Sequence, residues 1–281
     1  MAPPERATAP VKIRIGEVAA TAYRLVFGRL GLALELGWLP LLVMLAAELA
    51  PDAIELLRPL PADAAAPPIR IADIIGIVAA LLCLNAFAVR WYQALLQVAI
   101  AAAPPRRVFL VAWVRFILYT VIFSLPAAGS AIAFALTGAS PTAADDASRL
   151  LVAAIALPSL VLALAVVRLS LVWPAAAQGF PMGWRAAWRA MRGNTWRLLA
   201  VMFVVYVPIF VTAAAALAIV LAAAHIEIEQ AMAHPTLGVV LLQGVLDTLA
   251  RFIVIALGAT VLVEFYRRLV LNAPAGKSAA S

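Results

Sequence analysis

Arginine and tryptophan are concentrated in one short stretch, WRAAWRAMRGNTWR, which runs from Trp184 to Arg197. At 100° per helical residue, three of its arginines share one face, and Trp184, Trp188 and Met191 form the neighbouring stripe. Guanidinium groups bind phosphate oxygens, and indole rings prefer the depth of lipid headgroups. The pattern therefore predicts a basic helix lying in a membrane interface, with a dedicated ligand site as the alternative. The expected headgroup contacts are Trp184, Arg185, Trp188, Arg189, Arg192, Trp196 and Arg197.

The end of this stretch predicts a sharp corner. Gly193 suits the left-handed position that terminates a helix. Asn194 or Thr195 is a typical cap for the helix that follows. We therefore expect a surface helix, a turn, and then the start of a long apolar helix.

Residue types that carry catalysis or bind metals are otherwise sparse. His225 and His234 are the only histidines, and they lie with Glu227 and Glu229 in HIEIEQAMAH, which reads as a solvated loop or, less favourably, a metal site. No G-x-S-x-G, Walker or C-x-x-C motif is present, and Cys83 is the only cysteine. We expect no enzyme activity, no cofactor and no metal.

Charged residues within or beside the apolar runs are Glu35, Arg90, Arg168, Asp247, Arg251 and Glu264. An ionisable group in hydrocarbon costs about 2.5–3.5 kcal/mol on insertion scales and needs a partner. Asp247 and Arg251 have the i, i+4 spacing of a helical ion pair. Glu35 lies at a depth where Arg90 or Arg168 can meet it. A structural ion pair is the preferred interpretation, and a polar crevice for an anionic headgroup or substrate is the alternative.

The elements that position these residues are membrane helices. Only 12% of the 281 residues are charged and 66% are hydrophobic, and the mean hydropathy is +1.04. A soluble domain carries about 25% charged residues. The apolar runs match the roughly 20 residues that a helix needs to cross a bilayer. The composition therefore predicts an all-α, polytopic membrane bundle.

Six spans are predicted, near residues 31–50, 71–90, 108–136, 150–177, 196–223 and 248–268. The residues from Thr236 to Leu246 are expected to form a separate lead-in helix on the outer surface. Prolines within the spans predict kinks, because proline removes a backbone donor. These prolines are Pro40, Pro126, Pro158, Pro174 and Pro208.

The basic residues fix the predicted orientation. If the N-terminus is cytoplasmic, nearly all arginines and lysines fall on the inner side, with only Arg58, Arg70 and Arg149 outside and Arg251 unassigned. The positive-inside rule then places both termini in the cytoplasm, in a bacterial inner membrane. Because the net charge of +7 follows membrane topology, anionic lipid headgroups of the cytoplasmic leaflet are the expected partners, and nucleic acid is not.

An internal repeat is the last sequence pattern. Arg29 and Pro40, Arg115 and Pro126, and Arg197 and Pro208 are each eleven residues apart, with apolar sequence between them. The pattern indicates either three repeated helical hairpins or three unrelated hairpins that obey the same membrane rules. The expected organisation is a disordered tail over 1–10, one membrane domain over 11–272 with units 11–103, 104–178 and 179–272, and a disordered tail over 273–281.

The segment RLSLVWPAAAQGFPMGWRAAWRAMRGNTWRLLAV, from Arg168, resembles the membrane domain of glycerophosphoryl diester phosphodiesterases and related uncharacterised bacterial inner-membrane proteins. The shared features are Pro174, the polar turn from Gln178 to Gly183, the Arg192-Gly193-Asn194 corner and Trp196-Arg197. The resemblance implies a six-helix fold. It carries over no catalytic residue, because in that family the catalytic domain is separate and soluble.

Two functions are compatible with these patterns. The first is a non-enzymatic scaffold or lipid-interacting membrane module. The second is a transporter or a protein that handles lipids or anionic substrates, in which the kinked helices line a path. Transport predicts a cytoplasm-facing cavity into which Glu35, Arg90 and Arg168 point, whereas a scaffold predicts a sealed apolar bundle.

Overall fold

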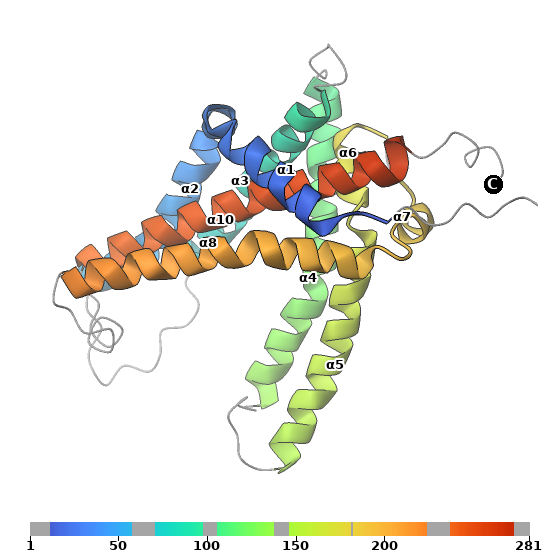
Figure 1. Ribbon diagram of the computed structural model, residues 1–281. Helices are drawn as coiled ribbons and strands as arrows, with labels where there is room; N and C mark the ends of the chain where they lie inside the picture. Colours follow the sequence, from blue (N-terminus) through green and yellow to red (C-terminus); the bar gives the residue numbers. More distant parts are fainter. Residues whose placement is uncertain are drawn as a thin grey trace, which may run out of the picture. The chain divides into compact units, whose positions relative to one another are not determined.

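The computed structural model describes residues 12–57, 71–97, 106–137, 146–180, 182–223 and 237–272, and within these ranges it is helical without strands. Figure 1 shows the helices in chain order. Their bounds are α1 Ile15–Phe27, α2 Leu30–Leu57, α3 Ile71–Gln97, α4 Arg106–Thr137, α5 Asp146–Leu169, α6 Val172–Ala177, α7 Trp184–Ala190, α8 Thr195–Ala223 and α10 Leu237–Tyr266, followed by the π-helical turn Arg267–Leu271.

Five of these helices, α2, α3, α4, α8 and α10, are long and apolar enough to cross a membrane. A helix of about 20 apolar residues spans the hydrocarbon core. Large apolar side chains also face outward along them, such as Trp38 on α2, Ile77 on α3 and Phe203 on α8. An apolar surface of this extent is covered by lipid rather than water. The all-helical, membrane-spanning class predicted from the sequence is confirmed, and five of its six spans meet these criteria.

The predicted fourth span, over 150–177, is not one helix. Helix α5 ends at Leu169, and the short α6 begins at Val172 after a turn at Ser170 and Leu171. Pro174 explains the break, because a proline ring clashes with the carbonyl of the residue four positions earlier, here Ser170. Within α5, the continuous apolar part among the described residues runs over Leu157–Leu169.

The prediction of a separate lead-in helix before the last span is also wrong. Helix α10 runs without interruption from Leu237 to Tyr266. Its sequence contains no proline, and its glycines at 238, 244 and 258 lower helix propensity without removing a backbone donor. The lead-in segment and the last span are therefore one rod of about 45 Å, at 1.5 Å per residue.

The other prolines lie inside continuous helices. Pro40 is in α2, Pro126 in α4, Pro158 in α5 and Pro208 in α8. A proline in a membrane helix is tolerated where other groups satisfy the freed carbonyls. Pro208 frees the Val204 carbonyl, four residues earlier. Two nearby carbonyls accept side-chain hydrogen bonds: the Val205 carbonyl from the Tyr23 hydroxyl at 2.8 Å, and the Pro208 carbonyl from the Thr212 hydroxyl at 2.7 Å.

The chain forms two compact units, and α8 and α10 contribute residues to both of them. Unit 1 comprises 1–15, 106–200 and 262–281, and unit 2 comprises 16–105 and 201–261. These units combine residues from different predicted hairpins, so the threefold repeat stays a prediction. The tails over 1–10 and 273–281 lie outside the described residues.

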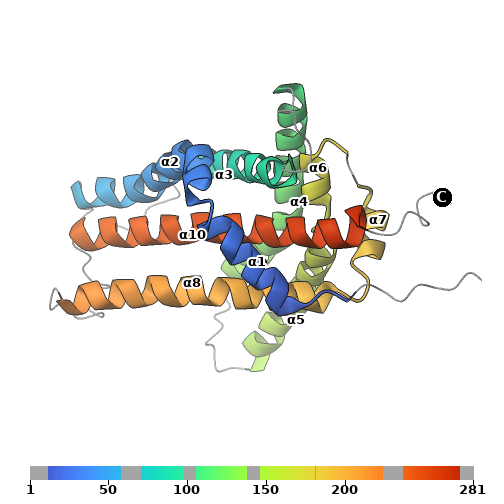
Figure 2. The same cartoon turned by 45° about the horizontal axis from the view of Figure 1, so that its top comes forward.

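Unit 2 is built around aromatic side chains from α3 and α10. The ring of Phe87 stacks on Phe252 at 4.3 Å between centroids. The buried Trp91 indole N–H donates to the Ala256 carbonyl and the Thr260 hydroxyl, both at 3.0 Å. Helix α2 packs against α3, and α10 runs beside α8 (Figures 1 and 2). The indole hydrogen bonds fix the register of α3 against α10, because they satisfy a donor that has no water to bond.

Helix α1 is the most clearly amphipathic element of unit 2. Val18, Ala19, Ala22 and Val26 form its buried stripe, at the spacing of one helical face. Figure 2 shows α1 lying across α8 and α10, and Tyr23 makes the hydrogen bond to α8 described above. The apolar face of α1 is therefore covered by protein.

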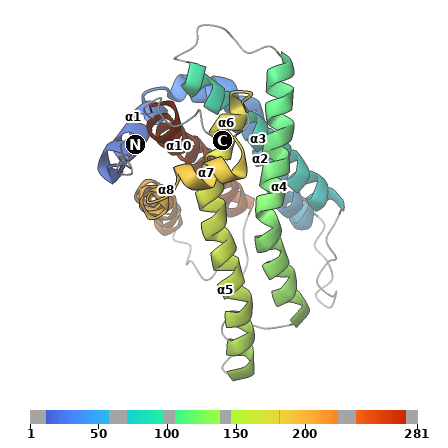
Figure 3. The same ribbon diagram turned by 90° about the vertical axis from the view of Figure 1, so that its right-hand side faces the viewer.

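Unit 1 contains α4 to α7 and the start of α8. Helix α4 packs against α5 and α6, and α5 packs against α7; Figure 3 shows α4 and α5 side by side. Gly179 ends α6 with a φ of 82°, and a Cβ there would lie 3.2 Å from Val108 of α4. This packing places the arginine- and tryptophan-rich segment at the end of α5.

Candidate functional site

The segment from Trp184 to Arg197 forms the predicted helix, turn and new helix. Helix α7 ends at Ala190, Gly193 has a φ of 82°, and α8 begins at Thr195. Ala187 and Met191 are fully buried and attach the corner to unit 1. Met191 was expected on the interfacial stripe with the tryptophans, so the stripe is split between exposed indoles and a buried methionine.

The cap of α8 serves a second purpose that the sequence patterns did not predict. The Asn194 carbonyl accepts the first helical hydrogen bond, from the Leu198 N–H at 2.9 Å. The Asn194 side-chain oxygen accepts from the Ile13 N–H at 3.4 Å. The Arg197 guanidinium donates to the Ile13 carbonyl at 2.7 Å. The corner therefore binds both backbone groups of Ile13, whose side chain is only 1% exposed.

This clamp changes the role of Arg197. Its guanidinium uses one of its five N–H donors on the Ile13 carbonyl, a contact within the protein. Arg185, Arg189 and Arg192 remain exposed, as does Trp196 at 72%. The clamp joins positions more than 180 residues apart. Only a weak sequence signal exists for it, namely an apolar residue at position 13 among charged neighbours.

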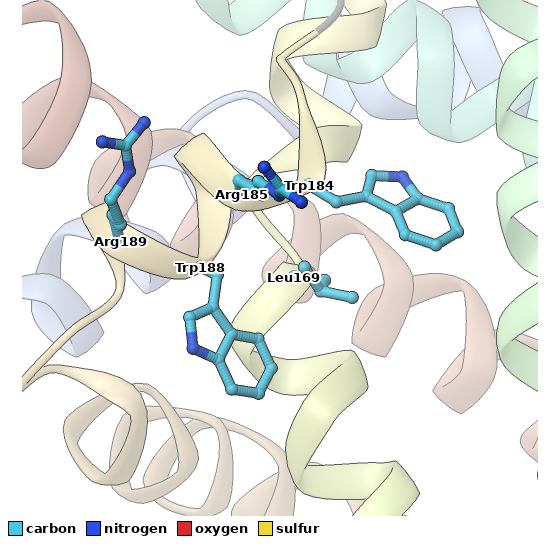
Figure 4. Close-up of a pocket in the computed structure, with 5 residues that line it drawn as sticks. All are labelled: Leu169, Trp184, Arg185, Trp188 and Arg189. Carbon is cyan, nitrogen blue, oxygen red and sulfur yellow. The ribbon is translucent and has the colours of Figure 1, made fainter. Parts of the chain in front are cut away.

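An open cavity of about 590 Å³ lies beside α7, and Leu169, Trp184, Arg185, Trp188 and Arg189 line it. We call it the α7 groove. Figure 4 shows the Leu169 side chain between the two indole rings, while the Arg189 side chain extends away from the Trp188 ring. The groove thus has an apolar floor and a cationic edge.

Residues from α4 and α5 support the indole walls. The Arg168 guanidinium lies 4.1 Å from the centre of the Trp188 ring, and its Nε donates to the Trp188 carbonyl at 3.4 Å. Phe123 of α4 contacts the Trp173 ring edge-on at 4.9 Å and lies 6.5 Å from the Trp184 ring. Cation–π and aromatic contacts of this kind contribute roughly 0.5–1.5 kcal/mol each. Both indoles are therefore partly held in place before any ligand arrives.

The charged residues predicted near the spans are only partly brought together. Arg251 pairs with Asp247 at 2.6 Å, as predicted, and Glu264 pairs with Arg268 at 2.7 Å. Glu35 lies exposed on α2 and Arg90 exposed on α3. Arg168 instead engages Trp188.

Groups of three or more possible metal ligands are not found among the described residues. His225 and His234 lie in residues 224–236, which are outside that part of the chain. Two buried hydroxyls, Ser170 Oγ and Thr248 Oγ1, make no hydrogen bond in the described structure. Ser170 follows directly on Leu169 of the groove and sits where α5 breaks.

The fold and this site together define a multi-pass helical membrane protein with a basic and aromatic corner at the start of a span. Comparison with protein-family models, curated proteins and solved structures finds no match to the chain. The resemblance to the phosphodiesterase membrane domain therefore stays a prediction.

Proposed function

We propose that this protein is a non-enzymatic, six-span inner-membrane protein, with both termini in the cytoplasm, that interacts with anionic lipids at the α7 corner. Lipids are its main partners, and it works as a scaffold or lipid-interacting module. The observation that carries this proposal is the α7 groove, where two arginines edge a floor of tryptophan and leucine.

A phospholipid has a charged headgroup and apolar chains, and the α7 corner offers a contact to each. Arginines near an anionic leaflet each contribute on the order of 1 kcal/mol of attraction. Exposed indoles add affinity for the headgroup region, because one edge of the ring is polar and the rest apolar. Trp184 and Trp188 are 48% and 40% exposed, so each presents a face outward while the protein supports the other. The same segment begins α8, which supports a place at the membrane surface.

Extraction into native lipid discs tests this proposal. Mass spectrometry of the disc lipids is expected to show enrichment of anionic phospholipids over the bulk membrane extracted with the same polymer. An unrelated multi-pass protein of similar hydropathy, purified in parallel, serves as the control. A disc lipid composition equal to that of the bulk membrane would contradict the proposal.

The transport alternative rests on kinked helices and on charges that face a common path. The α7 groove is lined by none of Glu35, Arg90 and Arg168. Glu35 and Arg90 are exposed on their helices, and Arg168 supports an indole. No observation on the described residues favours transport over lipid interaction.

A further inference from the structure

We infer that the α7 groove is a binding site for a single anionic phospholipid, whose phosphate lies at Arg185 and Arg189 and whose first chain methylenes lie on Leu169 between the two indoles. This inference rests on the proposed function and names the ligand of its site. It distinguishes a saturable site of defined composition from general attraction between a basic surface and a charged leaflet.

The dimensions and composition of the groove suit such a ligand. Its volume of about 590 Å³ lies within the range of roughly 300–1,000 Å³ that is typical of small-molecule sites. Apolar side chains form its floor, and the two arginines, one helical turn apart on α7, stand at its edge. A free phosphate ion would use the arginines alone, whereas a phospholipid uses both the edge and the floor.

The charges of the groove select an anionic headgroup. None of the described residues that line it is acidic. A zwitterionic headgroup with an ammonium group would therefore bring one positive charge close to two guanidinium groups, without a carboxylate to receive it. A headgroup such as glycerol carries only the phosphate charge, which complements the arginines.

The walls of the groove are preorganised. Arg168 holds Trp188 through its backbone carbonyl and its ring, and Phe123 lies beside Trp184. Less side-chain freedom is lost on binding when the contacting groups are already ordered. Arg168 is thus a positioning residue for this site, acting through Trp188.

The corner itself supplies a matched control. Arg192 is exposed and lies on the same segment, yet it does not line the groove. General electrostatic attraction treats Arg185, Arg189 and Arg192 alike, because each carries one charge near the same surface. The affinity of a single-lipid site depends on Arg185 and Arg189 and does not depend on Arg192.

Native mass spectrometry of the full chain in a charge-neutral detergent, titrated with phosphatidylglycerol, tests the inference. The wild type is expected to bind one lipid saturably. Arg185→Ala and Arg189→Ala, made singly so that each removes one charge, are each expected to weaken this binding about tenfold or more, since charge-assisted contacts to phosphate are lost. Arg192→Ala, which also removes one charge, is expected to stay within about twofold of wild type. Equal losses in the three single variants would overturn the single-lipid site.

Competitors separate the possible ligands. Phosphatidylethanolamine, inorganic phosphate and glycerol phosphate are each expected to displace phosphatidylglycerol only at concentrations about a hundredfold higher. Equal competition by inorganic phosphate would show that the groove binds phosphate without a lipid chain. Equal competition by phosphatidylethanolamine would remove the selection for negative charge.

A fluorescence measurement avoids dependence on the arginine variants. Phosphatidylglycerol brominated near the headgroup end of its chain is expected to quench tryptophan emission saturably, and Trp188→Phe is expected to remove part of that quenching. Quenching that is unchanged in Trp188→Phe and in Trp184→Phe overturns the placement of the chain. Enrichment of anionic lipid in wild-type discs alongside that result would leave the proposed function intact and reject only the groove.

Discussion

Gly193 carries the turn that joins α7 to α8, and its φ of 82° lies in the left-handed region. A Cβ at such a position costs roughly 1–2 kcal/mol in a non-glycine residue. Gly193→Ala is therefore expected to lower the free energy of unfolding in detergent by about that amount. Thermal or denaturant unfolding followed by circular dichroism measures the change.

Gly183 provides the control for this substitution. Its φ is −64°, and a Cβ there would have no neighbour within 4 Å. Gly183→Ala is expected to leave stability within about 0.5 kcal/mol of wild type. If both alanine variants unfold like wild type, then the left-handed turn does not constrain the corner.

Tyr23 links α1 to α8 through its hydroxyl, which donates to the Val205 carbonyl at 2.8 Å. Burial raises the pKa of Tyr23 above its ordinary value of 10.0. The folded protein therefore holds this proton more tightly than the unfolded chain. Stability from this group is fully present below pH 10 and is lost as the pH rises through the raised pKa of the folded state.

The expected result is a steeper fall in melting temperature above pH 10 for wild type than for Tyr23→Phe. At neutral pH the variant is expected to lose about 1 kcal/mol, the net value of one hydrogen bond. Parallel curves for the two proteins from pH 8 to pH 11 would show that this phenol does not titrate differently in the two states.

At the residue scale, local patterns were informative and distant contacts were not. Gly193 and the pair of Asp247 and Arg251 were predictable because each depends on neighbours within one helical turn. The clamp on Ile13 by Asn194 and Arg197 depends on residues brought together only by the fold. No spacing rule connects such positions.

Close approach between helices fixes the core of unit 2. A Cβ on Gly37 of α2 would meet the ring of Phe252 on α10 and lie 3.1 Å from Phe87 on α3. Phe252 cannot move aside easily, because it stacks on the buried Phe87. Small residues in membrane helices allow contacts of this kind.

Gly37→Ala is therefore expected to destabilise the protein by about 1–3 kcal/mol, the usual cost of overpacking. Gly31→Ala, on the same helix but with no neighbour within 4 Å of a Cβ, is expected to be neutral or slightly stabilising. Unfolding in a graded series of dodecyl sulfate in mixed micelles compares them. A neutral Gly37→Ala would contradict the packing of Phe252 against α2.

At the element scale, the apolar runs located the starts of α2, α3, α4 and α8 to within two residues, but α2 and α3 each end seven residues beyond the predicted spans. The break between α5 and α6 was missed because hydropathy is continuous through Ser170 and Leu171, whereas the backbone responds to Pro174. The lead-in segment of α10 was missed for another reason. The apolar sequence from Leu237 to Leu271 is longer than one untilted span needs, so a boundary was expected before Asp247, but no residue there interrupts the helix.

The number of spans determines on which side of the membrane the two termini lie. Five spans place them on opposite sides, and six place them on the same side. Helix α5 has 24 residues, about 36 Å at 1.5 Å per residue, which is long enough to cross the hydrocarbon core. Its described apolar part is shorter than a full span. Whether α5 crosses the membrane therefore decides on which side the C-terminus lies.

Cysteine labelling in intact cells answers this question, because Cys83 is the only native thiol and Cys83→Ser gives a clean background. A membrane-impermeant maleimide is expected to label Asp63→Cys and Ser140→Cys directly, and Ser278→Cys only after permeabilisation. The reason is that an excess of arginine and lysine holds the inner connections in the cytoplasm. Direct labelling of both Ser140→Cys and Ser278→Cys in intact cells would remove α5 as a span, and protection of Ser140→Cys would contradict the crossing of α4. The loss of α5 as a span would also move the α7 corner away from the leaflet that its arginines are proposed to bind.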